Sequence, residues 1–137
     1  MRHVNEKLLR SYLGPGNCDV CGRFCSKCCA HHVMPRSRCR IDHPFHLLRV
    51  GLDYWNDCKC HQRFESLPKD DAMALGLPIL AKRDGTTVAA LEDVIAVIRS
   101  MPPRPPASMV RLRLAELTGE SHALASKVFR DLGLLET

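Results

Sequence analysis

The sequence predicts an α+β chain in which a small cysteine-rich unit of hairpin and helix precedes a helical half. Two observations indicate this division. All eight cysteines and six of the seven histidines fall within residues 1–66, where eleven Lys and Arg outnumber six Asp and Glu. Residues 67–137 carry nine basic and nine acidic side chains and place apolar residues at helical spacing. We therefore divide the chain into a domain over residues 1–75 and a helical region over residues 76–137.

The first elements are short and punctuated by glycine. Val4, Leu8 and Leu9 mark one side of a short helix over residues 4–13, which "GPGN" at 14–17 ends. The next segment, "CDVCG", predicts a tight Cys-x-x-Cys turn. Such a turn is the usual form of a zinc knuckle, because the backbone must curl until both sulfurs face one ion.

A strand, a loop and a helix are expected next. Residues 28–34, "CCAHHVM", predict a short strand. The polar, proline-punctuated residues 35–45 predict a loop, in which we expect His43 to be exposed. The segment that starts at Cys58 begins as a helix and is interrupted near Pro68.

Helical periodicity dominates the second half. "TTVAALEDVIAVIRSM" has apolar residues at helical spacing, and Thr86 or Thr87 can cap its start. "PPRPPAS" at 102–108 is a stiff proline linker. The tail then predicts two helices on either side of a turn at Thr118–Ser121.

The tail has two interpretations. The favoured one is a helical hairpin that packs on the core or on a second subunit. Packing on a second subunit would make the protein a homodimer. The alternative is a helix-turn-helix over residues 108–135, whose second helix would enter the major groove of DNA. Five positions of that helix are expected to be exposed: Ser121, His122, Ser126, Lys127 and Arg130.

Targeting signals and membrane segments are not visible in the sequence. The first fourteen residues lack an uninterrupted apolar stretch, and no run approaches membrane-spanning length. We therefore expect a cytoplasmic protein with no membrane partner, in which cysteine clusters bind metal more often than they form disulfides. The basic surplus of the first half indicates a polyanionic partner.

Four motifs carry the chemistry: "CDVCG", "HHVMPRSR", "DHPFHLL" and "CKCHQRFE". His31 follows Cys21 by ten residues, and His46 follows His32 by fourteen. Over residues 16–66 this order resembles the HNH endonucleases of the His-Me finger superfamily, particularly those braced by a cysteine zinc site and found in bacteria and their phages. The resemblance implies a zinc-braced treble-clef, or ββα-metal, unit that hydrolyses DNA.

The resemblance also implies a role for each motif residue. His32 would be the general base, because a neutral imidazole accepts a proton from water near pH 7. His31 and His61 would hold a catalytic Mg²⁺ or Mn²⁺ ion, and Glu65, one helical turn after His61, could add an oxygen ligand. Three arginines at alternate positions would grip flanking phosphates: Arg36, Arg38 and Arg40. The products would carry 5′-phosphate and 3′-hydroxyl ends.

Three features depart from the family pattern. His46 stands where asparagine is usual, and it could orient the loop beside the base or touch the metal. "RVGLDYWND" lengthens the segment before the second cysteine pair, and within it Tyr54 and Trp55 could stack on a base or pack under the loop. The second knuckle reads Cys-x-Cys, with Asp57 as a substitute ligand of lower rank.

The preferred structural zinc ligands are the two outer cysteine pairs: Cys18, Cys21, Cys58 and Cys60. Cys25 and Cys28 form an alternative knuckle that could displace the first pair. Otherwise the remaining thiols are small buried side chains: Cys25, Cys28, Cys29 and Cys39.

Two other functions remain open at this point. A non-catalytic zinc-finger protein that binds nucleic acid could keep the same fold, although a purely structural finger needs neither His31 nor His32. A nuclease directed at RNA would use the same residues.

Overall fold

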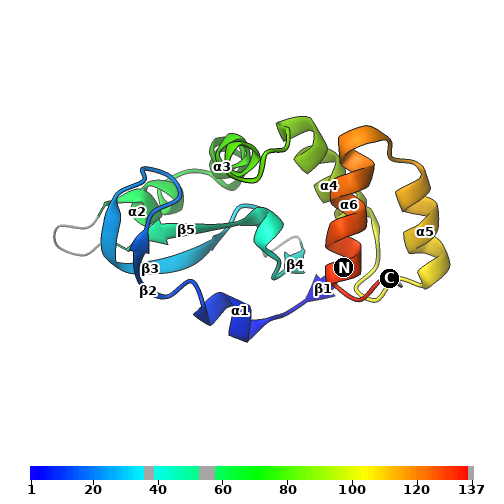
Figure 1. Ribbon diagram of the computed structural model, residues 1–137, viewed down its shortest axis with the longest axis horizontal. Coiled ribbons are helices and arrows are strands. Elements are labelled where there is room, and N and C mark those ends of the chain that lie inside the picture. Colours follow the sequence, from blue (N-terminus) through cyan, green and yellow to red (C-terminus); the bar gives the residue numbers. More distant parts are fainter. Residues whose placement is uncertain (36–38, 53–57, 136–137) are drawn as a thin grey trace.

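A computed structural model describes residues 1–35, 39–52 and 58–135 of the chain. It is α+β, as the sequence predicts. The three-stranded sheet lies at one end of the molecule and α4, α5 and α6 lie at the other, as Figure 1 shows. The elements follow in the order β1 (Arg2–His3), α1 (Glu6–Arg10), β2 (Gly14–Asn17), β3 (Phe24–His32), β4 (Arg40–Ile41), η1 (Pro44–His46), β5 (Leu47–Gly51), α2 (Cys60–Glu65), α3 (Lys69–Asp84), α4 (Val88–Ser100), α5 (Ala107–Ala115) and α6 (Gly119–Asp131).

The main sheet has the strand order β2-β3-β5 and is antiparallel. The strand expected over residues 28–34 instead runs from Phe24 to His32. It begins earlier because "GPGN", expected only to end a helix, is itself a strand that pairs with the first half of β3. At the other end of β3, His31 pairs with Leu48 and His32 with Leu47. The two histidines are therefore the last two residues of the central strand.

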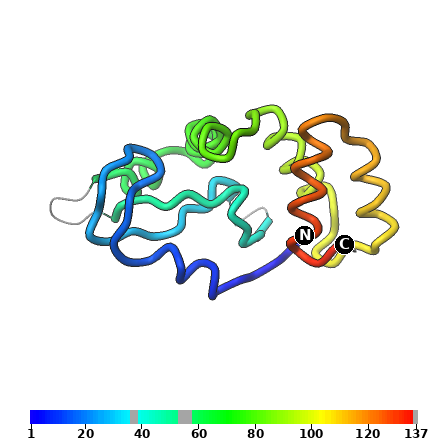
Figure 2. Tube along the Cα trace, in the orientation of Figure 1, coloured from blue at the N-terminus to red at the C-terminus, as the bar shows by residue number. Residues whose placement is uncertain are grey.

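The N-terminal segment crosses the molecule. Figure 2 traces it from the helical end, past the sheet, to β2. β1 pairs in parallel with β4, and Asn5 caps α1 by accepting a hydrogen bond from the Leu8 backbone at 3.0 Å. The helix expected over residues 4–13 contains only Glu6–Arg10, because no residue of α1 is buried to extend it.

The helical half follows the sequence pattern closely. α2 ends before Pro68 and α3 begins after it, as predicted. Thr87 caps α4 through a 3.1 Å hydrogen bond from the Ala90 backbone. One face of α4 is buried: Ala90, Leu91, Val94, Ile95, Val97 and Ile98. The domain boundary expected after residue 75 falls inside α3, whose Arg83 donates to the carbonyls of Pro44 and Leu47 and so fastens this helix to the sheet region.

The tail consists of α5 and α6, and α6 packs against α4. The expectation that Ser126 is exposed is wrong. Ser126 is 8% exposed, because it lies on the buried face of α6 beside Ala125 and Phe129. Ser121 donates to Asp93 of α4 at 2.6 Å. Within the described residues, no helix has the length and apolar character needed to cross a membrane.

Candidate functional site

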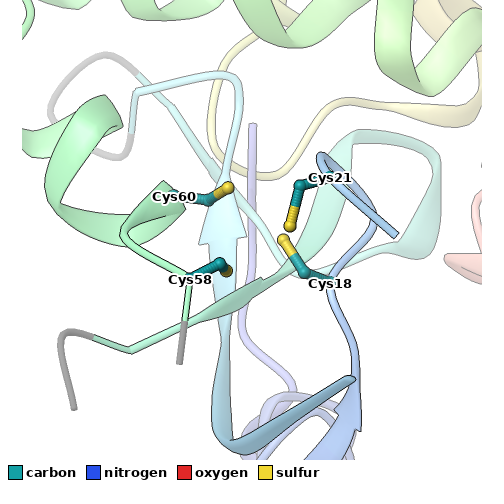
Figure 3. Close-up of side chains that lie close together, drawn as sticks. All are labelled: Cys18, Cys21, Cys58 and Cys60. Atoms are coloured by element: carbon teal, nitrogen blue, oxygen red, sulfur yellow. The ribbon is translucent and has the colours of Figure 1, made fainter. Parts of the chain in front are cut away.

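Four thiols meet at one end of the sheet. Cys18 and Cys21 come from the turn between β2 and β3, while Cys58 precedes α2 and Cys60 is its first residue; Figure 3 shows the four side chains converging. Their sulfur atoms all lie within 4.8 Å of one another. A tetrahedral zinc ion with Zn–S bonds of about 2.3 Å separates its sulfurs by about 3.8 Å, so the four thiols could close on a zinc ion with small side-chain movements.

The first knuckle is built by its backbone. Cys18 donates to the Arg23 carbonyl at 2.9 Å, and Gly22 donates to the Cys18 carbonyl at 2.8 Å. Gly22 has a φ of 74°, a left-handed conformation that glycine adopts without a steric cost. The turn therefore brings the two thiols of "CDVCG" to the same side, as the spacing predicts.

Cys25 adjoins this cluster without belonging to it. Its buried sulfur lies 3.4 Å from the sulfur of Cys58 and accepts a hydrogen bond from the Cys58 backbone at 3.4 Å. Cys28 instead lies 3.5 Å from the Gly16 carbonyl, so these two cysteines do not form the alternative knuckle. Both are buried, as is Cys39, whose thiol donates to the Met1 carbonyl. Cys29 is half-buried and packs at the edge of the core.

The thiols of the cluster differ in acidity. Burial by itself raises the pKa of Cys58, but hydrogen bonds from the Cys60 backbone and from the Cys25 and Cys18 side chains lower it to about 6. Burial and the neighbouring thiols raise the pKa of Cys60 above its ordinary value. Burial likewise raises the pKa of Cys21. Cys58 thus ionises more readily than Cys60 and Cys21.

A pocket of about 480 Å³ lies between the end of β3 and the helices α2 and α3. His31 projects into it and stacks on Phe64, with ring centroids 4.3 Å apart. Burial, followed by the nearby His32 and His61, lowers the pKa of His31 to about 4, so its ring is neutral at pH 7. Within the described part of the chain, the buried Nε2 of His31 has no hydrogen-bond partner.

His61 and Glu65 line the same pocket from α2. They stand four residues apart, and the His61 Nε2 lies 3.7 Å from a Glu65 carboxylate oxygen. The helical spacing therefore places both on one face, as expected. Because Cys60 starts α2, the residue that follows it turns toward the pocket, which couples the position of His61 to that of the thiol cluster.

His32 also lines this pocket, and its Nε2 lies 2.8 Å from Asp42, a residue for which the sequence had suggested no role. The guanidinium of Arg40 lies 3.2 Å from Asp42 and 3.1 Å from Glu6. Arg40 was expected to grip phosphate; in the structure its partners are carboxylates of the protein. The aspartate of "DHPFHLL" was the available signal for Asp42, since a carboxylate near a predicted base has an obvious chemical use.

His46 is fully buried and does not line the pocket. Its Nε2 donates to the Ile41 carbonyl, and its Nδ1 accepts from the Met34 backbone at 3.4 Å. Burial lowers its pKa to about 3, so the ring stays neutral. His46 therefore joins the two ends of the 34–41 segment, which corresponds to the loop-orienting option for this position.

The expectation that His43 is an exposed loop residue is wrong. His43 is 8% exposed, accepts from the Phe45 backbone at 3.0 Å and contacts the Asp131 carboxylate at 2.9 Å. The contact joins the residue that precedes η1 to the last residue of α6, and the sequence near His43 does not encode it.

Several residues singled out in the sequence lie outside the described part of the chain: Arg36, Arg38, Tyr54, Trp55 and Asp57. Comparison of the chain with protein-family models, curated proteins and solved structures finds no match.

Proposed function

We propose that this protein is a metal-dependent HNH endonuclease that hydrolyses DNA phosphodiester bonds on a zinc-braced treble-clef unit. One observation carries the proposal: His31 and His32 from β3 and His61 from α2 line a single pocket next to the four-thiol cluster. The motif order in the sequence supports the same function. A zinc ion on the thiols would hold the start of α2, and thereby His61, against the sheet.

The residues of the pocket fit a second, catalytic divalent ion. His31 is neutral, and its buried Nε2 has no partner within the described residues, which suits a nitrogen reserved for a metal. His61 would be the second ligand and Glu65 a further oxygen donor. When bound, Mg²⁺ or Mn²⁺ would stabilise the negative charge that develops on the leaving oxygen.

His32 would act as the general base. It takes a proton from a water molecule, whose oxygen forms a bond to phosphorus while the bond from phosphorus to the 3′ oxygen breaks. The 3′ oxygen acquires a proton from solvent. The products are a 5′-phosphate and a 3′-hydroxyl, and the basic surplus of residues 1–66 would attract the polyanionic substrate.

The test is nicking of supercoiled plasmid by wild type, His32→Ala and His122→Ala, each with EDTA, Mg²⁺ or Mn²⁺. His122 is an exposed histidine of α6 and serves as a matched control. We expect nicking by wild type and His122→Ala with metal only, and a loss of about 10²-fold or more in His32→Ala.

Two results would contradict the proposal. Nicking by His32→Ala at the wild-type rate would show that His32 is not the general base. A folded wild type that is inert with every metal on duplex, branched and single-stranded DNA would favour the non-catalytic zinc-finger protein, and cleavage confined to RNA would favour the RNA-directed nuclease.

A further inference from the structure

We propose that Asp42 is a positioning residue that holds His32 in the tautomer with hydrogen on Nε2, so that Nδ1 is the nitrogen that accepts the proton. The catalytic part of this inference rests on the proposed function. The contact between the two residues stands on geometry: the His32 Nε2 and the Asp42 Oδ1 are 2.8 Å apart, and the Asp42 side chain is inaccessible to solvent.

Asp42 has donors on both carboxylate oxygens. The Asn5 backbone donates to Oδ2 at 2.7 Å, and Arg40 donates from Nη2 to Oδ2 at 3.2 Å and from Nε to Oδ1 at 3.5 Å. These contacts come from the start of α1 and from β4, so the carboxylate is held from two directions. A side chain held in this way cannot turn to follow the imidazole; the imidazole must adapt to it.

The ionisation state of Asp42 determines which atom carries the hydrogen. Burial by itself raises the pKa of Asp42, but the hydrogen bonds from His32, the Asn5 backbone and Arg40 lower it below its usual value. An ionised carboxylate only accepts hydrogen bonds. The His32 Nε2 must therefore be the donor, and in the neutral ring the lone pair is on Nδ1.

His46 does not compete with Asp42 as an acceptor for the ring hydrogen of His32. The ring of His46 lies 5.5 Å from that of His32, but both of its nitrogens are engaged with the Met34 and Ile41 backbone. Asp42 thus places the ring hydrogen of His32 on Nε2 through the 2.8 Å contact. Once His32 has taken a proton, the same carboxylate stabilises the imidazolium, which an uncharged partner of equal shape would not do.

Asp42→Asn makes a sharp test because its amide has a preferred orientation. The Asn5 backbone and the Arg40 Nη2 donate at the Oδ2 position at 2.7 and 3.2 Å, whereas the Arg40 Nε lies farther from the Oδ1 position, at 3.5 Å. The amide oxygen therefore belongs at the Oδ2 position, where it keeps the two shorter hydrogen bonds, and the NH₂ group faces His32. An NH₂ donor requires a lone pair on Nε2, which moves the ring hydrogen to Nδ1. The variant is therefore expected to reverse the tautomer of His32 while it keeps the shape of the site.

The experiment is NMR of the imidazole nitrogens of His32 in the full, zinc-loaded chain without added Mg²⁺, at a pH where the ring is neutral. We expect the Nε2–H tautomer in wild type and the Nδ1–H tautomer in Asp42→Asn. Asp131→Asn is the matched control, because it removes the same charge from a second histidine–carboxylate pair, in which Asp131 lies 2.9 Å from His43 and outside the pocket. It should leave the His32 signals unchanged.

Plasmid nicking by the same three proteins completes the test. Asp42→Asn is expected to lower kcat by about 10²-fold with KM little changed, because the proton acceptor is lost and DNA binding is not. Asp131→Asn should nick at the wild-type rate.

Each outcome has one meaning. An Nδ1–H tautomer in wild type overturns the proposal even if Asp42→Asn fails to fold, and so does an Asp42→Asn protein with wild-type kcat. If wild type shows the Nε2–H tautomer but nicks no DNA, the contact is structural and the proposed function fails with the catalytic role of Asp42.

Discussion

Gly51 is the position at which a single methyl group should test the four-thiol cluster. It ends β5 and faces the sulfurs of two cysteines. A Cβ at Gly51 would lie 2.5 Å from the Cys58 sulfur and 2.6 Å from the Cys25 sulfur. Both distances are far below van der Waals contact, and both neighbours are short, buried side chains that cannot swing away. Gly51→Ala must therefore displace Cys58 or move the strand.

The expected loss of stability in Gly51→Ala follows from the packing of the new methyl group against two buried sulfurs. Overpacking of a buried site costs about 1–3 kcal/mol. Replacing a strand glycine by alanine returns about 0.5–1 kcal/mol through the backbone, so the net loss of stability is about 0.5–2 kcal/mol in zinc-loaded protein. Zinc affinity should fall as well, because one of the four ligands is pushed out of place.

Gly16→Ala is the matched control in the same sheet. Its Cβ would approach the guanidinium end of Arg49 at 2.5 Å, but that end belongs to a long side chain that can move. Its stability should equal or slightly exceed that of wild type. Cys25→Ala should partly restore Gly51→Ala, since it removes one of the two close sulfurs.

The assays are urea denaturation with zinc present and competition for zinc with a chromophoric chelator. The reasoning is refuted if Gly51→Ala matches wild type in both, or if Gly16→Ala and Gly51→Ala lose equal stability. In either case Cys58 and Cys25 would not lie where the structure puts them.

Two further predictions follow from the titrating groups. Zinc binding should release protons and tighten as pH rises from 6 to 8, because Cys60 and Cys21 have raised pKa values and must lose their protons to bind the ion. Cys58, whose pKa is about 6, should release fewer protons at pH 8 than either of them. Calorimetry in buffers of different ionisation enthalpy measures the number of protons released, and proton uptake would contradict the prediction. His46, with a pKa of about 3, is neutral in the folded protein and charges on unfolding below its ordinary pKa of about 6.5. Its contribution to stability is therefore present above that pH and is lost as the pH falls below it. Lowering the pH from 7 to 5 should reduce the free energy of unfolding of wild type by about 2 kcal/mol more than that of His46→Asn, as measured by urea denaturation. Equal losses in the two proteins would show that His46 is not buried in the folded chain.

The sequence was sufficient where the signal is local. Thr87 and the apolar period that follows it predict α4, and Pro68 predicts the break between α2 and α3. The spacing of the two outer cysteine pairs predicts a four-thiol group, and the structure brings those four thiols together. The helix signals and each cysteine pair depend on residues within a turn or two of one another, whereas the choice between the outer pairs and the alternative knuckle of Cys25 and Cys28 needed the structure.

Local reasoning was insufficient for residues whose partners are distant in the chain. The strand over "GPGN" required pairing with β3, and the burial of Ser126 required knowledge of which face of α6 meets α4. His43 was expected to be exposed because its neighbours are polar and proline-rich, but its partner, Asp131, stands 88 residues away.

The sequence by itself determined the cysteine and histidine motifs, their order and the helical character of the second half, because composition, spacing and periodicity are properties of the chain. Only the tertiary structure decided what each histidine contacts. His31 faces the pocket, His32 meets Asp42, and His46 is enclosed between Met34 and Ile41. The role of an imidazole depends on which group contacts each of its two nitrogens, and those contacts exist only after the strands have paired.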